Sequence, residues 1–70
     1  MKPGDLVSVY GGNTLHDERR IFVNGVEMTV LEIRGENGCG WVQCEHNDLN
    51  EETKHRYWFH QKQCYPTQKN

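Results

Sequence analysis

The chain has 70 residues, with eight Lys or Arg against ten Asp or Glu, so its formal net charge is −2 at pH 7. A chain of this length forms one domain with a thin core, which excludes a second domain and a deep catalytic cleft. The slightly acidic balance also argues against a dedicated nucleic-acid binder, which normally carries a strongly positive surface.

The N-terminal residues 1–5, MKPGD, contain no apolar stretch of the kind that a signal peptide requires. No later run approaches the roughly 20 apolar residues of a transmembrane helix. The three cysteines, Cys39, Cys44 and Cys64, are an odd number, which favours reduced thiols over a disulfide framework. We therefore expect a cytoplasmic protein that does not associate with a membrane.

The first predicted strand is DLVSVY, residues 5–10, in which apolar and polar side chains alternate. Gly11 and Gly12 follow it and indicate a turn. The next segment, NTLHDERR at 13–20, is too short and too polar to bury a face, whether it forms a loop or one helical turn. We expect it to be a mobile insertion between strands.

Two glycine-containing segments predict chain reversals. In RIFVNGVEMTV, residues 20–30, the pair Asn24-Gly25 separates two apolar runs and favours a two-residue type I′ hairpin. In RGENGCGW, residues 34–41, several glycines and an asparagine predict a turn between the strands MTVLEI and WVQC.

The stretch KHRYWFHQKQC, residues 54–64, is rich in aromatic and basic side chains. Aromatic residues favour a strand, which would turn Tyr57 and Phe59 to one face and Trp58 to the other. Pairing this strand with WVQCEH across the polar loop NDLNEETK gives one register with an apolar face. The register places Trp41, Val42, Gln43, Cys44, Glu45 and His46 opposite His60, Phe59, Trp58, Tyr57, Arg56 and His55.

Four or five short strands with glycine-rich turns and no clear helix predict an all-β fold. We expect a small, strongly bent antiparallel sheet, closed or nearly closed into an SH3-like barrel. Residues 1–66 would form this single domain, and Pro66 would lead into a flexible tail at 67–70.

Four short motifs occur along the chain: Gly4-Asp5-Leu6-Val7, Gly11-Gly12, Met28-Thr29-Val30 and Val42-Gln43-Cys44. In this order they resemble the YodC-like family of small uncharacterised bacterial proteins. The family pattern is a GD-V opening, a GG-x-x-MTV segment and a V-x-C-x-W strand. This chain differs by an insertion between Gly12 and Met28, and by His46 where the family has tryptophan. The resemblance implies a small β-barrel of bacterial or phage type and supplies no activity.

Potential metal ligands are Cys44, His46, His55, His60 and Cys64. The spacing of His60 and Cys64 fits half of a structural zinc site, but Cys44-x-His46 fits the other half poorly. We therefore favour a buried thiol in the barrel wall and histidines at its rim, without a metal or other cofactor. No nucleophile, base and water-excluding site assemble from the spacing, so we expect a protein that is not an enzyme.

A binding surface is the remaining functional candidate. Small barrels often bind single-stranded nucleic acid by stacking bases on an exposed aromatic residue beside cations, and Trp58 with Arg56 has these parts. Glu45 opposite Arg56 and the acidic run NDLNEE at 47–52 argue against it. Nucleic-acid binding therefore stays the alternative.

We favour a protein-interaction module, a regulator or inhibitor of a larger protein, because Trp and Arg dominate binding hot spots. The expected binding surface comprises Trp41, Arg56, Trp58 and His60, with Arg19, Arg20 and Phe22 on the inserted arm. An exposed edge strand could also pair two copies into a homodimer. The sequence does not choose between monomer and dimer, or between bacterial regulator and phage-coded inhibitor.

Overall fold

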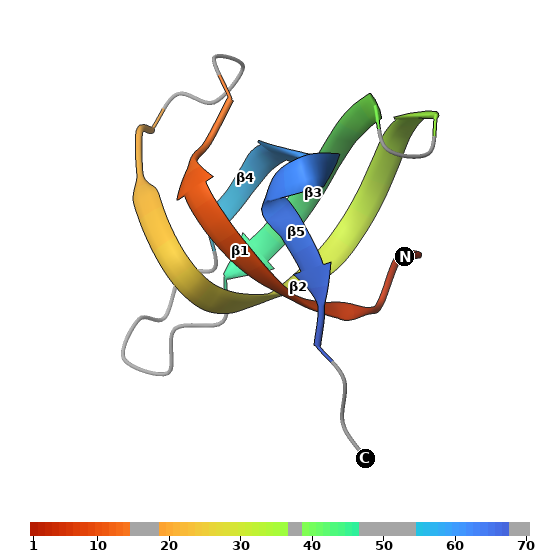
Figure 1. Cartoon of the computed structure of the whole chain (residues 1–70), viewed down its shortest axis with the longest axis horizontal. Coiled ribbons are helices and arrows are strands. Elements are labelled where there is room, and N and C mark those ends of the chain that lie inside the picture. The colour runs from red at the N-terminus through yellow and green to blue at the C-terminus, as the bar shows by residue number, and fades with distance from the viewer. Residues whose placement is uncertain (15–18, 37–38, 47–54, 68–70) are drawn as a thin grey trace.

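The structure, a computed structural model, describes residues 1–14, 19–36, 39–46 and 55–67 (Figure 1). Four predicted features lie partly or wholly outside these ranges: the middle of the insertion, the turn at 37–38, the polar loop at 47–54 and the tail at 68–70. The described elements are β1 (Leu6–Gly12), β2 (Phe22–Glu36), β3 (Cys39–His46), β4 (His55–His60), the short 3-10 helix η1 (Gln61–Gln63) and β5 (Cys64–Pro66).

The strands form one antiparallel sheet in the order β4-β3-β2-β1-β5. The long strand β2 pairs with β1 through its first half and with β3 through its second half. Figure 1 shows β2 curving around the molecule, so the two halves of the sheet face each other. The predicted all-β, strongly bent antiparallel sheet is confirmed, although the hydrogen-bonded ladder does not close, because β4 and β5 are its two ends.

The predicted hairpin at Asn24-Gly25 is wrong, because both residues lie within the continuous strand β2. Tyr10 pairs with Asn24 and Val9 with Val26, which leaves Gly25 as the extra residue of a bulge with φ of 75°. A bulge of the glycine type and a type I′ turn both use a positive φ, so the same dipeptide suits either. The chain instead reverses between β1 and β2 in the segment 13–21.

The predicted turn between β2 and β3 is confirmed by the pairing of Gly35 with Gly40 and of Glu36 with Cys39. The two strands approach closely here, since a Cβ on Gly35 would lie 2.7 Å from the Cα of Gly40. A Cβ on Gly40 would collide with the carbonyl oxygen of Arg34. Glycine at both positions is therefore a condition for this pairing.

The predicted register of β3 and β4 is confirmed at every pair. Partners are Trp41 and His60, Val42 and Phe59, Gln43 and Trp58, Cys44 and Tyr57, Glu45 and Arg56, and His46 and His55. Tyr57 and Phe59 point inward as expected, with exposed fractions of 5% and 0%. The side chains on one face of each strand thus pack in the core, and those on the other face lie at the surface.

The helix η1 was not predicted, and it turns the chain from β4 into β5. The backbone N–H of His60 donates to Oε1 of Gln63 (2.8 Å), and Nδ1 of His60 accepts from the N–H of Lys62 (3.2 Å). Nε2 of Gln63 donates to the carbonyl oxygens of Tyr10 (3.0 Å) and Gly12 (2.7 Å). Gln63 therefore joins this turn to the end of β1, beside the β1–β5 pairing.

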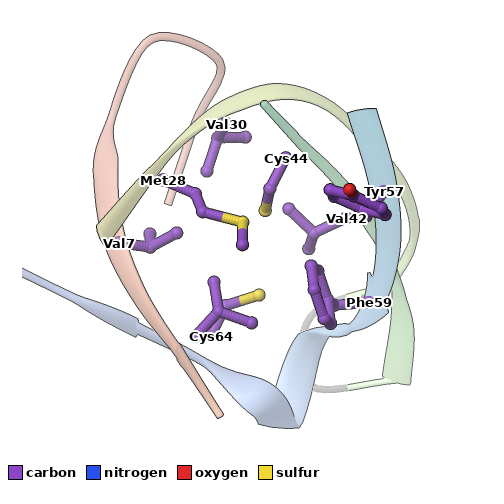
Figure 2. Packing of buried hydrophobic residues seen from close by; sticks show 9 residues of the cluster. Val7, Met28, Val30, Val42, Cys44, Tyr57, Phe59 and Cys64 are labelled. Carbon is purple, nitrogen blue, oxygen red and sulfur yellow. The ribbon is translucent and has the colours of Figure 1, made fainter. Parts of the chain in front are cut away.

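The core is a single cluster that draws on all five strands (Figure 2). Its buried members are Val7, Val9, Met28, Val30, Val42, Cys44, Tyr57, Phe59 and Cys64. Ile21, Val23, Val26 and Ile33 are partly buried and pack against it. The two halves of the bent sheet thereby bury the apolar side chains of their inner sides against each other.

The described ends of the insertion are held rather than mobile, which corrects the expectation for that part of it. Asn13 is buried, its Nδ2 donates to the carbonyl oxygen of Arg19, and its Oδ1 accepts from the N–H of Ile21 (3.1 Å). The N–H of Thr14 donates to the carbonyl oxygen of Trp58 on β4 (2.8 Å).

At the other end of the chain, Thr67 is the first residue of the expected tail. Its N–H donates to the carbonyl oxygen of Leu6 (3.1 Å), and its hydroxyl lies 3.4 Å from that of Ser8. The β1–β5 pairing is thereby prolonged beyond Pro66 by one residue.

Candidate binding surface

The outward side chains of β2, β3 and β4 form three rows across the sheet. In the first row lie Arg34, Trp41 and His60, in the second Glu32, Gln43 and Trp58, and in the third Thr29, Glu45 and Arg56. We call these nine residues the tryptophan face. The inward neighbours on β3 and β4 are buried, so alternation along the strands directs this set to the surface.

Trp41 is the exposed aromatic residue of the first row, with an exposed fraction of 39%. Its ring contacts the ring of His60 edge-on, with centroids 5.2 Å apart and planes at 81°. Because Nδ1 of His60 accepts the N–H of Lys62, the imidazole is held in place from the other side. The contact with this imidazole restricts the orientations open to the indole.

Trp58 is half-buried and has a cation over its ring. The guanidinium carbon of Arg34 lies 5.3 Å from the ring centroid, so the Arg34 side chain crosses β3 from β2 to β4. Nε of Arg34 also contacts Oε1 of Glu32 at 3.1 Å. Two contacts therefore hold a side chain that is still 68% exposed.

The third row contains the predicted cross-strand ion pair. Nε of Arg56 lies 3.9 Å from Oε2 of Glu45, and the two side chains are 65% and 13% exposed. The pairing of these strand positions confirms the prediction, but an ion pair this long and this exposed contributes at most about 1 kcal/mol. Its main effect is to place a carboxylate beside the second arginine of the face.

The tryptophan face does not include the three binding residues expected on the inserted arm, which are Arg19, Arg20 and Phe22. Nη1 of Arg19 donates to Nε2 of His55 (3.0 Å), which ties the end of the insertion to the start of β4. Phe22 is 81% exposed and pairs with Gly12 at the far end of the β1–β2 ladder. Arg20 is exposed, and in the described part of the chain neither it nor Phe22 contacts the tryptophan face.

The sequence reasoning missed the β2 residues of the face, among them Arg34, the cation that lies over Trp58. A usable signal existed, because Arg34 and Trp41 flank the glycine turn symmetrically and therefore had to be opposite each other. The bulge at Leu31, between the Val30–Cys44 and Glu32–Gln43 pairs, also had to be known to place Glu32 beside Gln43. The sequence carries no clear mark of that bulge.

The cysteines and histidines form no metal-binding cluster in the described ranges. No three His, Cys, Asp or Glu side chains lie close enough there to hold a metal ion. Cys39, Cys44 and Cys64 are all free thiols, and only Cys39 is exposed. A hydrogen bond with Cys64 and burial in the core raise the pKa of the Cys44 thiol, so this thiol is neutral at pH 7.

A second surface feature lies on the outer side of β1 and β5. It is a shallow, open groove of about 710 Å³ lined by Ser8, Tyr10, Tyr65, Pro66 and Thr67. The Tyr10 and Tyr65 rings meet edge-on, with centroids 5.5 Å apart and planes at 80°. We call it the tyrosine groove, and its lining residues carry no formal charge.

Comparisons of the chain with protein-family models, with curated proteins and with solved structures give no match. Over the described residues, no helix is both long and apolar enough to cross a membrane. What the molecule does must therefore be argued from its surfaces.

Proposed function

We propose that this chain is a small, non-enzymatic protein-interaction module that regulates or inhibits a larger protein. The observation that carries the proposal is the tryptophan face, where Trp41 and Trp58 lie in adjacent rows and Arg34 stacks on Trp58. Tryptophan and arginine are the residue types that contribute most to binding hot spots. Side chains already held by neighbours lose little further conformational entropy when a partner binds.

The distribution of charge favours a protein partner over nucleic acid. Arg34 has Glu32 at 3.1 Å, and Arg56 has Glu45 at 3.9 Å, so each arginine of the face lies next to a carboxylate. A surface that binds a phosphate backbone needs several cations without such neighbours. Mixed charges around two aromatic residues are instead usual at the rim of a protein interface.

Binding of single-stranded nucleic acid is the second candidate. The observation in its favour is the exposed Trp41 in the row next to the Arg34–Trp58 stack, since bases stack on indole rings and on guanidinium planes. The experiment below separates the two candidates directly.

The sheet edges favour binding at the face over strand addition. On β4, the carbonyl oxygen of Trp58 accepts the N–H of Thr14 from the same chain, in the middle of the strand. At the other edge, β5 has three residues and ends at Pro66, which has no N–H to donate. A homodimer would therefore also form through the tryptophan face.

A photo-crosslinking residue tests the proposal when it replaces Gln43, at the centre of the tryptophan face. The matched control carries the same residue in place of Glu27, an exposed position of β2 that faces outward beside Ser8. Both variants are irradiated in lysate of the cell that encodes the chain, with and without nuclease. We expect a protein adduct from position 43 alone, unaffected by nuclease and lost when Trp41→Ala is added.

Each other result has a defined meaning. An adduct of the chain with itself would identify a homodimer, and an adduct that nuclease removes would support the nucleic-acid candidate. Equal adducts from positions 43 and 27, or none from position 43, would refute binding at this face.

We further propose that the fold is SH3-like and that the chain is a YodC-like cytoplasmic protein of bacterial or phage type. Gly4-Asp5 and Val30, from two of the motifs behind that resemblance, are hydrogen-bonded: Gly4 N–H to Val30 O (2.8 Å) and Val30 N–H to Asp5 O (2.9 Å). Val30 in turn pairs with Cys44 of the third motif. Three free cysteines suit a reducing compartment. An experimental structure of a YodC-like protein without these pairings would contradict the kinship.

A further inference from the structure

The guanidinium of Arg34 has three distinct sides, and two of them are occupied. Its Cζ lies over the Trp58 ring, 5.3 Å from the ring centroid. Its Nε edge contacts Oε1 of Glu32 at 3.1 Å. Among the residues that the structure describes, none forms a hydrogen bond or ion pair with the remaining edge, which carries Nη1 and Nη2. The side chain is 68% exposed, so this edge is accessible from solvent.

The chemistry of that edge specifies a ligand group. Nη1 and Nη2 present two parallel N–H groups in the plane of the guanidinium, and a carboxylate accepts both at once. An exposed arginine usually loses side-chain entropy when it forms such a pair. Here the contacts with Trp58 and Glu32 have already restricted the Arg34 side chain, so less entropy remains to be lost.

The row that contains Arg34 adds an apolar contact and no negative charge. Trp41 is directly opposite Arg34, is 39% exposed, and is followed across the sheet by His60. Beyond His60, Lys62 is exposed in η1. A ligand lying along this row would meet a cation and then an exposed indole, which is complementary to an acidic segment with an apolar side chain.

We infer that the tryptophan face binds an acidic peptide segment, and that Arg34 binds a Glu or Asp carboxylate of that segment while a neighbouring apolar side chain packs on Trp41. This inference rests on the proposed function and names the partner's chemistry. A peptide fits better than a nucleic acid because Glu32 and Glu45 would repel a continuous phosphate backbone, whereas a peptide can present a single carboxylate to Arg34.

The test uses two acetylated and amidated hexapeptides, Gly-Ser-Glu-Trp-Ser-Gly and the same peptide with Gln in place of Glu, together with a six-nucleotide oligothymidylate. Each is titrated into the full chain, and the indole N–H signals of Trp41 and Trp58 are followed by NMR. We expect the Glu peptide to bind about fivefold more tightly than the Gln peptide, because one charged group is added at an exposed site. The preference should shrink at high salt.

Two variants with unchanged net charge locate the effect. Arg34→Lys keeps the cation but removes the planar pair of N–H groups, so the preference for Glu over Gln should disappear. Arg56→Lys makes the same chemical change in the third row and should keep the preference. Unchanged backbone spectra of both variants show that the fold is intact, and Arg34→Gln replaces Arg34→Lys if that variant does not fold.

Equal affinity for the two peptides, no binding of either up to millimolar concentration, or an unchanged preference in Arg34→Lys overturns the inference. Tighter binding of the oligothymidylate also overturns it. A protein adduct from position 43 combined with any of these results would leave the interaction module standing and remove only its acidic ligand. If position 43 gives no protein adduct and the Glu peptide is not preferred, both proposals are refuted.

Discussion

The tryptophan face and the tyrosine groove are the outer surfaces of the two halves of one bent sheet. Each contains an edge-to-face ring pair of similar geometry, Trp41 with His60 at 5.2 Å and Tyr10 with Tyr65 at 5.5 Å. The face on β2, β3 and β4 surrounds its rings with two Arg–Glu pairs, whereas the groove surrounds its rings with hydroxyl groups and a proline. Aromatic exposure alone therefore does not distinguish the surfaces, and charge does.

The strand β2 belongs to both surfaces and explains why they differ. Gly25 is the extra residue where β2 pairs with β1, and Leu31 is the extra residue where it pairs with β3. Each bulge shifts the alternation of inward and outward side chains by one residue. Variants that act on one half of the sheet, or on the link between the halves, test this difference.

The largest expected effect is that of Gly40→Ala at the base of the tryptophan face. The new Cβ would collide with the carbonyl oxygen of Arg34, so β2 and β3 must separate. We expect a loss of about 3 kcal/mol of unfolding free energy, a large part of what a domain this small possesses. Urea denaturation of the variant and of the unchanged chain measures this loss.

Gly12→Ala on β1 is the matched control, because its Cβ would lie 3.6 Å from the carbonyl oxygen of Ile21, an ordinary contact. It should change the unfolding free energy by less than about 1 kcal/mol. Similar losses for the two variants would show that the β2–β3 approach is not as tight as described.

The next effect is that of Gln63→Ala, which acts between the two halves. Its side chain accepts one hydrogen bond, from His60, and donates two, to Tyr10 and Gly12, so the variant leaves three backbone groups without these partners. We expect a loss of about 2 kcal/mol of unfolding free energy. Lys62→Ala, the exposed neighbour in η1, should lose under about 0.5 kcal/mol, and equal losses would contradict the role of Gln63.

A smaller effect is the difference in coupling energy between each arginine of the tryptophan face and its neighbour. A double-mutant cycle of Arg34→Ala with Trp58→Ala should give a coupling of about 0.5–1 kcal/mol, as expected for an exposed cation over an indole. The cycle of Arg56→Ala with Glu45→Ala should give under about 0.5 kcal/mol and vanish at high salt. A stronger Arg56–Glu45 coupling would reverse the ranking of the two pairs.

The smallest effect is expected from the tyrosine groove. Tyr65→Ser removes one ring of the Tyr10–Tyr65 pair and leaves the tryptophan face untouched. The yield of the protein adduct from position 43 should stay unchanged, while Trp41→Ala abolishes it. Loss of the adduct in Tyr65→Ser would mean that both surfaces contact the partner, and the comparison would fail.

The β3–β4 register was predicted correctly because a slip by one residue would put polar side chains in the core opposite Val42 and Cys44. The Asn24-Gly25 hairpin failed for a different reason. A positive φ at glycine is compatible with a turn and with a bulge, and only the long-range pairing of β1 across Gly25 decides between them.

The candidate site was predictable to the extent that it depends on alternation. Trp41, Trp58, Arg56 and His60 follow from the β3–β4 register, and the structure places them on one face. Arg34 was not predicted because its side chain reaches across β3 to Trp58. This contact depends on the rotamer of Arg34 and on the bulge at Leu31 rather than on the local sequence pattern. Long flexible side chains are where pattern-based reasoning loses precision.

Asn13 has a consequence for protein engineering. Its side chain bonds to the backbone of Arg19 and of Ile21, and its N–H bonds to the carbonyl oxygen of Ile21. One buried residue therefore joins the two ends of the insertion. Extra residues placed between positions 14 and 19 would add mainly loop-closure entropy, about 0.6 kcal/mol for each doubling of loop length. A fluorescent or affinity reporter can therefore be inserted between Thr14 and Arg19 at that cost as long as Asn13 is kept.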